Sequence, residues 1–518
     1  MKGNWAILVL ALILGVALRT ARLDLRPMHT DEAVHALKFG ALLEQGVYHY
    51  DKKEYHGPTL NYFTLPGAWL ASEKTLSDVN EVTLRIVPAF FGICLFLLPL
   101  LLTGLGMRSA LLAALLGACS PSLAFYSRYY IQETLLVCFS FALIVACYRH
   151  RVSGKASYAL ACGACAGLMF ATKETWIISC AVMIVAALAV VLIGRRAGAG
   201  TISLRPFHVA LALGSFCAVA IIFFSSFFSH WDGVRDSILA YGTYFTRASE
   251  SSRHGHPWYY YLQMLLYSGG DKGPIWSEAG VVAFAFVSMA LGMRTKDALQ
   301  ARGAGLRVFL SLYAMLLLII SSVLPYKTPW LVLGILQPLT VVAGSGISDF
   351  FRWCQMRHLR PLALLASGVV VSYAAFQTYE ANFVYYDDTS NPYVYSHPTQ
   401  DVRQVADLVL HASQGGRQPV QVICSGDDYW PLPWYLRSLK ATGWWNALGS
   451  DFVPTPIILA SPDIEPALLE RLYETPPPGT RNLYVPLFDR PMFLRPGKEI
   501  RGYITLDLQS RLQKEKLG

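Results

Sequence analysis

Long apolar runs recur along the first three quarters of the chain, and they constrain its fold more than any other feature. A run of about 20 apolar residues crosses the roughly 30 Å hydrocarbon core of a membrane as a helix. A content of 54% hydrophobic residues and a mean hydropathy of +0.39 agree with a membrane protein. We count about eleven spans, at residues 5–22, 82–104, 109–125, 131–148, 158–171, 175–193, 207–227, 280–293, 308–323, 330–347 and 361–378. No small-x-small cleavage pattern follows the first span, so we interpret it as a retained helix and not as a signal peptide.

Basic residues fall on one side of these spans. Cytoplasmic loops are enriched in Lys and Arg, and the basic positions lie at 108, 149–155, 195–205, 294–307 and 352–360. This alternation places the N-terminus in the cytoplasm and predicts a multi-pass protein of the plasma, or inner, membrane. The net charge of +9 then reflects topology, and we predict no nucleic-acid partner.

The first outer loop, residues 23–81, carries an adjacent acidic pair at the start of a predicted helix. Thr30 is a suitable cap, Asp31 and Glu32 lie in the first turn, and Gly46 ends the helix. The plain structural interpretation is that these carboxylates complement the helix dipole, for about 0.3 to 1 kcal/mol each.

The surroundings of the pair favour a functional interpretation. Asp31 and Glu32 lie at a membrane face beside His29 and His35, where water must reach them. Asp31 and His35 are four residues apart and share a helix face. We predict Asp31 and Glu32 as the catalytic residues, with one carboxylate serving as a base. This segment offers two or three candidate metal ligands. Binding of a divalent metal ion therefore stays an open alternative, and the sequence does not define the metal site.

Cations gather at the other outer boundaries. SRYYIQE, from Ser127, contains Arg128, a forked donor suited to phosphate, and Lys173 and Lys327 follow at later boundaries. A lone Lys at such a position is more often a snorkelling anchor. A site that combines one carboxylate base, several cations and interfacial aromatic rings suits the transfer of a sugar from a lipid phosphate. The predicted substrate-binding residues are His35, Tyr55, His56, Arg128, Tyr129, Gln132, Glu133, Lys173, Glu174, Asp232, Lys327 and Trp330.

The chain divides into a membrane module, residues 1–380, and a C-terminal domain, residues 381–518. In the latter, apolar runs shorten to strand length in PVQVIC and TPIILA, with a helical stretch at 399–411, which predicts a small extracytoplasmic α/β domain. Its YWPLPWYLR segment either packs on the membrane module or contacts an acceptor glycan. A second outer loop of the module, residues 229–275, is either a substrate lid or an interfacial segment.

The acidic pair, the many spans and the extracytoplasmic sites resemble the GT-C glycosyltransferases, which include protein O-mannosyltransferases and aminoarabinose transferases. The chain resembles more closely the archaeal-type flippase-activity-associated family, through DEAVH from Asp31, YHGP from Tyr55, SRYYIQE from Ser127, YKTPW from Tyr326 and YWPLPWYLR from Tyr429. The resemblance implies an α-helical integral membrane protein of GT-C type and a polyprenyl-phosphate sugar donor. It makes Asp31 the base or acceptor-orienting acid and Glu32 its structural partner. The acceptor is an extracytoplasmic glycan, lipid or protein.

The alternative function is a non-catalytic partner of lipid-linked glycan translocation. Charged residues should then line a head-group pathway inside the spans, and the predicted spans contain few mid-helix charges. This favours an enzyme with inverting attack assisted by Asp31. We find no P-loop or dinucleotide fingerprint, so the sequence offers no site for a nucleotide-sugar donor.

Overall fold

The computed structural model describes residues 2–52, 56–196, 205–250, 255–269, 273–292, 303–477, 479 and 481–517. The chain forms two compact units. We call Met1–Leu23, Ala41–Ser72 and Asn80–Val394 the helical unit, and Asp24–Gly40, Glu73–Val79 and Tyr395–Gly518 the α/β unit. The predicted boundary after residue 380 therefore falls inside the helical unit. Two segments of the first outer loop fold with the C-terminal residues instead of the membrane module, because their backbone groups bond to side chains there.

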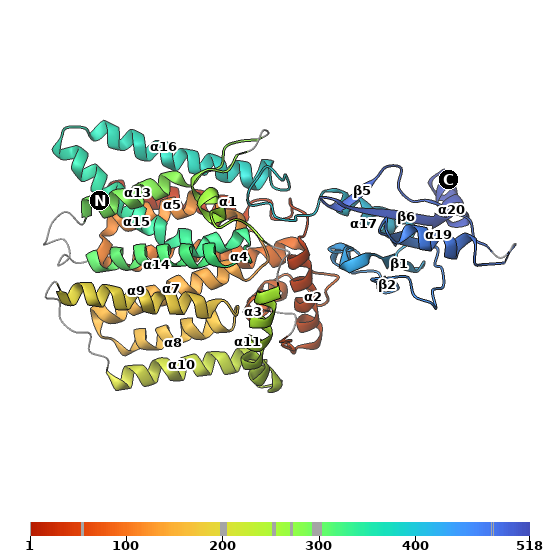
Figure 1. Cartoon of the computed structure of the whole chain (residues 1–518), viewed down its shortest axis with the longest axis horizontal. Coiled ribbons are helices and arrows are strands. Elements are labelled where there is room, and N and C mark those ends of the chain that lie inside the picture. Colours follow the sequence, from red (N-terminus) through yellow and green to blue (C-terminus); the bar gives the residue numbers. More distant parts are fainter. Residues whose placement is uncertain are drawn as a thin grey trace. The chain divides into compact units, whose positions relative to one another are not determined.

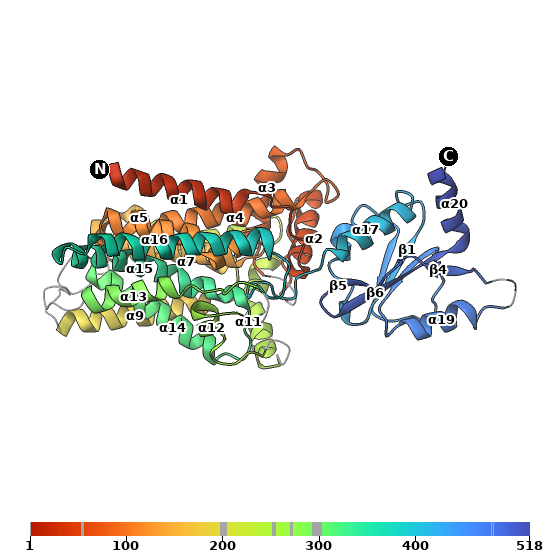
Figure 2. The same ribbon diagram turned by 90° about the horizontal axis from the view of Figure 1, so that it is seen from above.

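The helical unit is a bundle whose long helices run side by side, with α3 and α11 across one end (Figures 1 and 2). Each predicted span overlaps helical structure, as local hydrophobicity dictates, although the span predicted at 109–125 is divided into two helices at Ser120. The helices are α1 (Lys2–Thr20), α3 (Thr59–Leu70), α4 (Glu81–Leu97), α5 (Met107–Cys119), α6 (Pro121–Tyr126), α7 (Glu133–Ser153), α8 (Ala156–Phe170), α9 (Trp176–Arg196), α10 (Pro206–Phe224), α11 (Asp232–Glu250), α12 (Tyr260–Leu266), α13 (Ala279–Gly292), α14 (Ala304–Val323), α15 (Val332–Met356) and α16 (Arg360–Tyr379).

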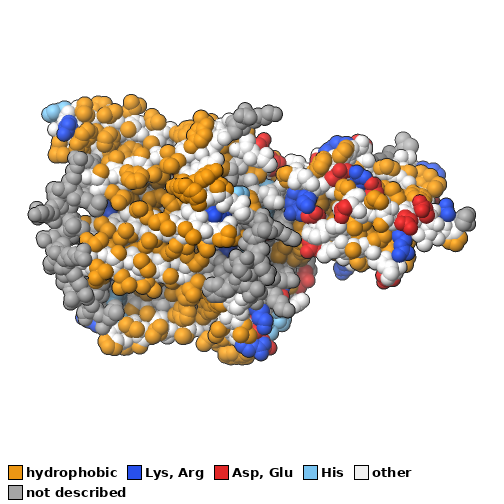
Figure 3. Space-filling view, in the orientation of Figure 1, with side chains coloured by type: hydrophobic (Ala, Val, Ile, Leu, Met, Phe, Trp, Pro, Cys, Tyr) orange, Lys and Arg blue, Asp and Glu red, His pale blue; other side chains and the backbone are white. Residues whose placement is uncertain are grey.

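Seven helices among the described residues are long and apolar enough to cross a membrane, and they lie at α4, α7, α9, α10, α14, α15 and α16. Four shorter apolar helices are Asn4–Thr20, Met107–Cys119, Ala156–Phe170 and Ala279–Ala290. Hydrophobic side chains cover much of the face of the bundle seen in Figure 3. Exposed hydrophobic residues of the bundle include Leu188, Phe207 and Leu365. The chain is thus a multi-pass membrane protein, and eleven crossings stay a prediction.

Small residues allow the bundle helices to approach closely. A Cβ at Gly163 of α8 would lie 1.9 Å from the carbonyl oxygen of Ala212 in α10. A Cβ at Gly346 of α15 would lie 1.8 Å from the carbonyl oxygen of Phe284 in α13. Neither position accepts a side chain without moving a backbone, which is the packing expected where helices associate without a hydrophobic driving force.

The helix ends that carry the predicted cytoplasmic basic residues pair with one another. His150, at the end of α7, lies 2.9 Å from His208 at the start of α10, between ring nitrogens. Arg307, at the start of α14, donates to Asp349 near the end of α15 at 2.7 Å. These contacts join helix ends that the alternation places on the same side, and the cytoplasmic assignment of these ends stays a prediction.

The α/β unit contains a mixed sheet of strand order β2-β1-β3-β6-β4, with β5 paired to β6. Strand β1 is parallel to β2 and β3, whereas β6 is antiparallel to β3, β4 and β5. The strands are β1 (Val420–Ile423), β2 (Thr442–Trp445), β3 (Ile457–Ala460), β4 (Tyr484–Pro486), β5 (Met492–Arg495) and β6 (Lys498–Thr505). The helices are α17 (Asp401–Ala412), α18 (Leu432–Tyr435), α19 (Glu465–Tyr473) and α20 (Leu506–Leu517).

The predicted strands in PVQVIC and TPIILA and the predicted helix at 399–411 are confirmed as β1, β3 and α17. Both strands are fully buried because their alternate residues pack on opposite faces of the sheet. Val422 and Leu459 belong to a core with α17 and α20, while Ile423 and Ile458 belong to a core with α19. Lys, Arg, Asp and Glu side chains are frequent on the surface of this unit (Figure 3).

Candidate functional site

The acidic pair lies at the N-terminus of α2 (Thr30–Gln45), which begins in the α/β unit. His29 caps the helix, because its Nδ1 accepts the backbone N–H of Asp31 at 3.0 Å. Glu32 Oε2 accepts the backbone N–H of His29 at 3.0 Å, which completes a reciprocal capping box. The predicted cap at Thr30 is wrong: Thr30 is the first helical residue, and its buried hydroxyl has no partner among the described residues. The predicted end at Gly46, with φ +74°, is confirmed.

The two acids occupy different environments. The Glu32 side chain is fully buried and lies 3.8 Å from the guanidinium of Arg26. The Asp31 side chain is 44% exposed and lies 3.8 Å from His29 Nδ1. His35, one turn further along α2, is buried. Asp31 is therefore the carboxylate that a substrate can reach, while Glu32 secures the start of the helix. The catalytic assignment of both stays a prediction.

His29 is held as a neutral imidazole. Its Nδ1 accepts a hydrogen bond from Asp31, and its Nε2 lies 3.0 Å from the carbonyl oxygen of Tyr395, so we place the ring proton on Nε2. Burial lowers the pKa of His29, although the nearby carboxylates of Asp31 and Glu32 act in the opposite direction. The ring also packs 5.0 Å from that of His397, centroid to centroid. A protonated His29 would lose the bond that caps α2.

The helical unit contains a compact ionic cluster, which we call the Lys173 cluster: Tyr50, His56, Glu133, Lys173 and Glu174. Lys173 forms a buried ion pair with Glu133. Glu174 accepts from His56 Nδ1 at 2.7 Å and from the hydroxyl of Tyr50 at 3.4 Å. The structure thus brings four predicted site residues together.

Neighbouring groups in and around the Lys173 cluster offset the effect of burial on Lys173 and Glu174. Burial by itself would lower the pKa of Lys173, but Glu133, Tyr326 and Glu174 raise it overall. Burial likewise opposes ionisation of Glu174, yet His56 lowers its pKa overall. Both groups are therefore charged at neutral pH. Because Glu133 neutralises it, Lys173 is a poor candidate for an anion site.

Close backbone contacts explain why the YHGP motif contains a glycine. The N–H of Gly57 donates to the carbonyl oxygen of Thr172 at 3.1 Å, directly before Lys173. A Cβ at Gly57 would lie 2.1 Å from the carbonyl oxygen of Ala171. This close approach brings His56 to Glu174. Tyr55, the first residue of the motif, lies outside the described residues.

Lys327 is a buried cation of a different kind. Its side-chain nitrogen donates to the carbonyl oxygen of Leu324, and no described carboxylate pairs with it. Trp330 follows one turn later and is buried, with ring centroids 6.0 Å from Tyr129 and 6.2 Å from Tyr126. A buried ammonium with no described carboxylate partner fits an anionic ligand, because a buried charge is costly without a partner.

Two predicted ligands have other roles. Arg128 donates to the carbonyl oxygens of Leu18, Ala21 and Arg22 at 3.3, 2.7 and 3.0 Å, so it caps the C-terminal end of α1. A phosphate contact of Arg128 stays a prediction beside this capping role. Asp232 begins α11, is exposed and lies 3.5 Å from Arg235. No contact joins Asp232 to the Lys173 cluster among the described residues. Gln132 is buried at the start of α7.

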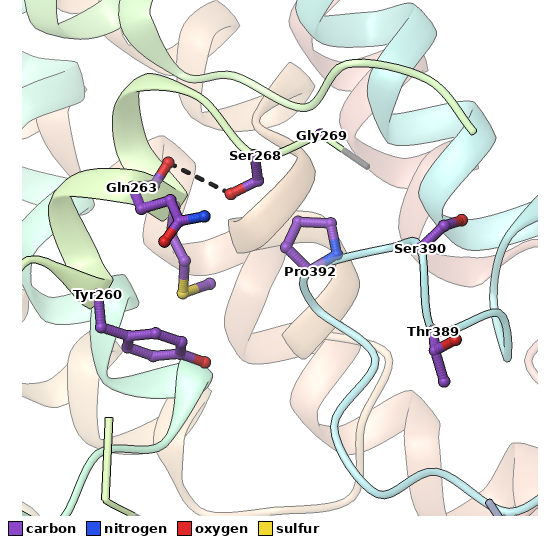
Figure 4. A pocket seen from close by; sticks show the side chains of 8 residues that line it. Tyr260, Gln263, Ser268, Gly269, Thr389, Ser390 and Pro392 are labelled. Carbon is purple, nitrogen blue, oxygen red and sulfur yellow. Dashed lines mark hydrogen bonds between the residues drawn. The ribbon is translucent and has the colours of Figure 1, made fainter. Parts of the chain in front are cut away.

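The described residues contain no group of three or more His, Cys, Asp or Glu side chains that could hold a metal ion. They do enclose a pocket of about 260 Å³ between α12 and residues 389–392 (Figure 4). The side chain of Gln263 points toward Pro392 across it. The described residues that line it include no Lys, Arg, Asp or Glu, and the sequence did not signal this pocket.

Comparison with known proteins agrees with this architecture. Residues 65–225 match the dolichyl-phosphate-mannose-protein mannosyltransferase family. ArnT from Cupriavidus metallidurans, solved with bound undecaprenyl phosphate, superposes with a TM-score of 0.65 at 13% identity, over 97% of this chain and 98% of that one. The chain therefore shares the overall fold of this ArnT. The oligosaccharyltransferase of Archaeoglobus fulgidus, solved with Zn and sulfate, gives a TM-score of 0.51 at 12% identity, over 88% of this chain and 68% of that one. No curated protein matches the chain in sequence.

Proposed function

We propose that this protein is a glycosyltransferase that moves a sugar from a polyprenyl-phosphate donor to a glycan, lipid or protein acceptor. The proposal places the reaction on the extracytoplasmic face of the plasma membrane. The observation that carries it is the buried Lys327, which has no described carboxylate partner. The support from outside the chain is the GT-C fold, shared with an ArnT that was solved with undecaprenyl phosphate.

Lys327 suits the leaving group of this reaction. When the bond between the anomeric carbon and the phosphate oxygen breaks, negative charge develops on the phosphate. A fixed ammonium in a site of low dielectric stabilises that charge more strongly than water does. The ring of Trp330, three positions after this lysine in the sequence, lies 6.0 Å from that of Tyr129, centroid to centroid, and both rings offer flat apolar faces to a sugar or a prenyl chain. A neutral sugar donor would make no ionic contact with the ammonium of Lys327.

Asp31 suits the acceptor side of the reaction. The acceptor hydroxyl attacks the anomeric carbon, its proton passes to the Asp31 carboxylate, and polyprenyl phosphate departs with the bonding electron pair. Displacement in one step inverts the anomeric configuration. The exposed Asp31 side chain can exchange its proton with water after each turnover. General base assistance of this kind contributes about 10²- to 10⁴-fold to a rate.

The test uses purified protein in liposomes with a radiolabelled polyprenyl-phosphate hexose. We expect Asp31→Asn to lower turnover at least about a hundredfold with donor binding retained. We expect Lys327→Gln to weaken binding of undecaprenyl phosphate at least about tenfold, because an ionic contact is lost. The exposed Lys155 supplies the matched control, and Lys155→Gln should change neither quantity.

The outcome decides between the proposal and its rival. Wild-type protein that binds polyprenyl phosphate but neither hydrolyses nor transfers the sugar of any donor tested would favour the non-catalytic partner of glycan translocation. Equal effects of Lys327→Gln and Lys155→Gln on lipid binding would remove Lys327 from the phosphate site.

A further inference from the structure

The part of the chain that carries Asp31 folds with the C-terminal residues. Asp24–Gly40, which we call the acidic segment, belongs to the α/β unit together with Glu73–Val79 and Tyr395–Gly518. The acidic segment is short and has its own helix only from Thr30 onward. Its first six residues make no strand or helix, so their position depends on contacts with other parts of the unit.

Arg403 of α17 holds the beginning of the acidic segment. Its NH1 donates to the carbonyl oxygen of Leu25 at 3.2 Å. Its NH2 donates to the carbonyl oxygen of Arg26 at 3.2 Å and also to the backbone carbonyl oxygen of Asp24. One planar guanidinium thus binds three consecutive carbonyl groups. Only arginine presents its donors in such a rigid fork. These bonds fix the backbone immediately before the capping box.

Tyr435 of α18 holds the next residue. The backbone N–H of Met28 donates to the hydroxyl oxygen of Tyr435 at 2.8 Å. Met28 is fully buried and precedes His29, whose side chain caps α2 at Asp31. Leu432 and Trp434, the neighbours of Tyr435 in α18, are fully buried, so the tyrosine rests on a firmly packed base.

Arg437 supports the acidic segment from its other end. Its guanidinium lies 3.8 Å from the ring centroid of Trp434 and donates to the carbonyl oxygens of Leu76 and Val79 at 3.1 and 2.7 Å. Leu76 in turn packs against α2 at Gly40, where a Cβ would lie 2.8 Å from its side chain. The YWPLPWYLR motif therefore contacts the acidic segment directly through Tyr435 and indirectly through Arg437.

We infer that Tyr435 and Arg403 are positioning residues for Asp31, so that the C-terminal residues are a working part of the catalytic apparatus. The inference rests on the proposed function, in which Asp31 accepts the proton of the acceptor. The chain of contacts runs from Tyr435 to Met28, then to the His29 cap and to the first turn of α2. A carboxylate displaced by about 1 Å can lose about a hundredfold in rate. Neither residue needs to touch a substrate.

The test compares two tyrosines of the same motif. Tyr435→Phe removes only the hydroxyl that accepts from Met28. Tyr429→Phe is the matched control, because the hydroxyl of Tyr429 bonds the exposed Asp427 at 3.1 Å and does not reach the acidic segment in the structure. We expect Tyr435→Phe to lower kcat about ten- to a hundredfold with the KM for donor within about twofold. Tyr429→Phe should retain wild-type kcat, and both variants should bind undecaprenyl phosphate as the wild type does.

A second readout needs no turnover. Amide hydrogen exchange in peptides covering residues 24–40 should become faster in Tyr435→Phe and stay unchanged in Tyr429→Phe. Arg403→Lys should retain more kcat than Arg403→Ala, since an ammonium can still bond at least one of the three carbonyls.

The two readouts separate the positioning role from the proposed function. One outcome is faster exchange in Tyr435→Phe while the wild-type protein turns over no donor tested. That result would support the contact between Tyr435 and the acidic segment but overturn the proposed transferase function. Normal kcat in Tyr435→Phe, or a reduced kcat without faster exchange, would overturn the positioning role, because the effect would not arise from movement of the acidic segment.

Discussion

Substitution of Glu32 by glutamine should destabilise the α/β unit, whereas Asp31→Asn should remove activity and leave stability unchanged. Glu32 is fully buried, accepts the N–H of His29 at 3.0 Å and lies 3.8 Å from Arg26. Glutamine keeps an oxygen that can accept from His29 but removes the negative charge beside a buried guanidinium.

The expected loss follows from the environment of the pair. Removing one partner of a buried ion pair costs roughly 3–5 kcal/mol, and the 3.8 Å separation of Glu32 from Arg26 favours the lower end of that range. About 3 kcal/mol corresponds to a fall of roughly 6–12 °C in the unfolding midpoint of a unit of this size. Asp31 is 44% exposed, and an exposed substitution usually changes stability by less than about 0.5 kcal/mol.

Thermal unfolding of the purified protein in detergent, paired with turnover assays below the transition, measures both effects. We expect Glu32→Gln to unfold at lower temperature and to retain part of its kcat, and Asp31→Asn to unfold with the wild type and lack turnover. The division of roles would be refuted if Glu32→Gln unfolded at the wild-type temperature, or if Asp31→Asn lost as much stability.

Three further substitutions or conditions have defined outcomes. Because burial lowers the pKa of His29 in the folded protein, the unfolded chain binds its proton more readily. Stability should therefore be full above about pH 6.5, the unperturbed histidine value, and fall below it, and His29→Gln should flatten this part of the profile of unfolding midpoint against pH. Gly57→Ala should cost at least about 2 kcal/mol, because its Cβ would collide with a carbonyl oxygen, and an unchanged unfolding midpoint would contradict this contact. Arg128→Ala should cost about 2 kcal/mol through the lost cap of α1 while the affinity for undecaprenyl phosphate stays at the wild-type value; a selective loss of affinity in a lipid-binding assay would return Arg128 to the phosphate site.

The helices and the central strands were predictable because their signals are local. A span of apolar residues folds as a helix wherever it lies in a membrane protein, and the largely apolar runs of β1 and β3 suit the buried middle of a sheet. The cap of α2 was not predictable in the same way. Threonine is a common cap and histidine is not, and only the bonds of His29 to Asp31 and Glu32 decide between them.

The roles of the cations depended on partners that are distant in sequence. Arg128 bonds Ala21 across 107 positions, and Lys173 meets Glu133 across 40, whereas the bond of Lys327 among the described residues goes to a carbonyl three positions before it. Their sequence contexts look alike, since each is a single cation near an apolar span. Tertiary structure alone shows which charge is neutralised, which closes a helix end and which has no counter-ion among the described residues.

The contact between Arg403 and the acidic segment also sets an order of events during biosynthesis. Arg403 follows Leu25 by 378 positions, so at about 5–20 residues per second the ribosome makes it roughly 20–75 s later. During that interval most of the bundle has been made, but the backbone before Asp31 lacks its anchors. An unfinished or truncated chain can therefore insert into the membrane without an ordered acidic segment. Under the proposed function, such a chain cannot consume lipid-linked sugar before synthesis is nearly complete.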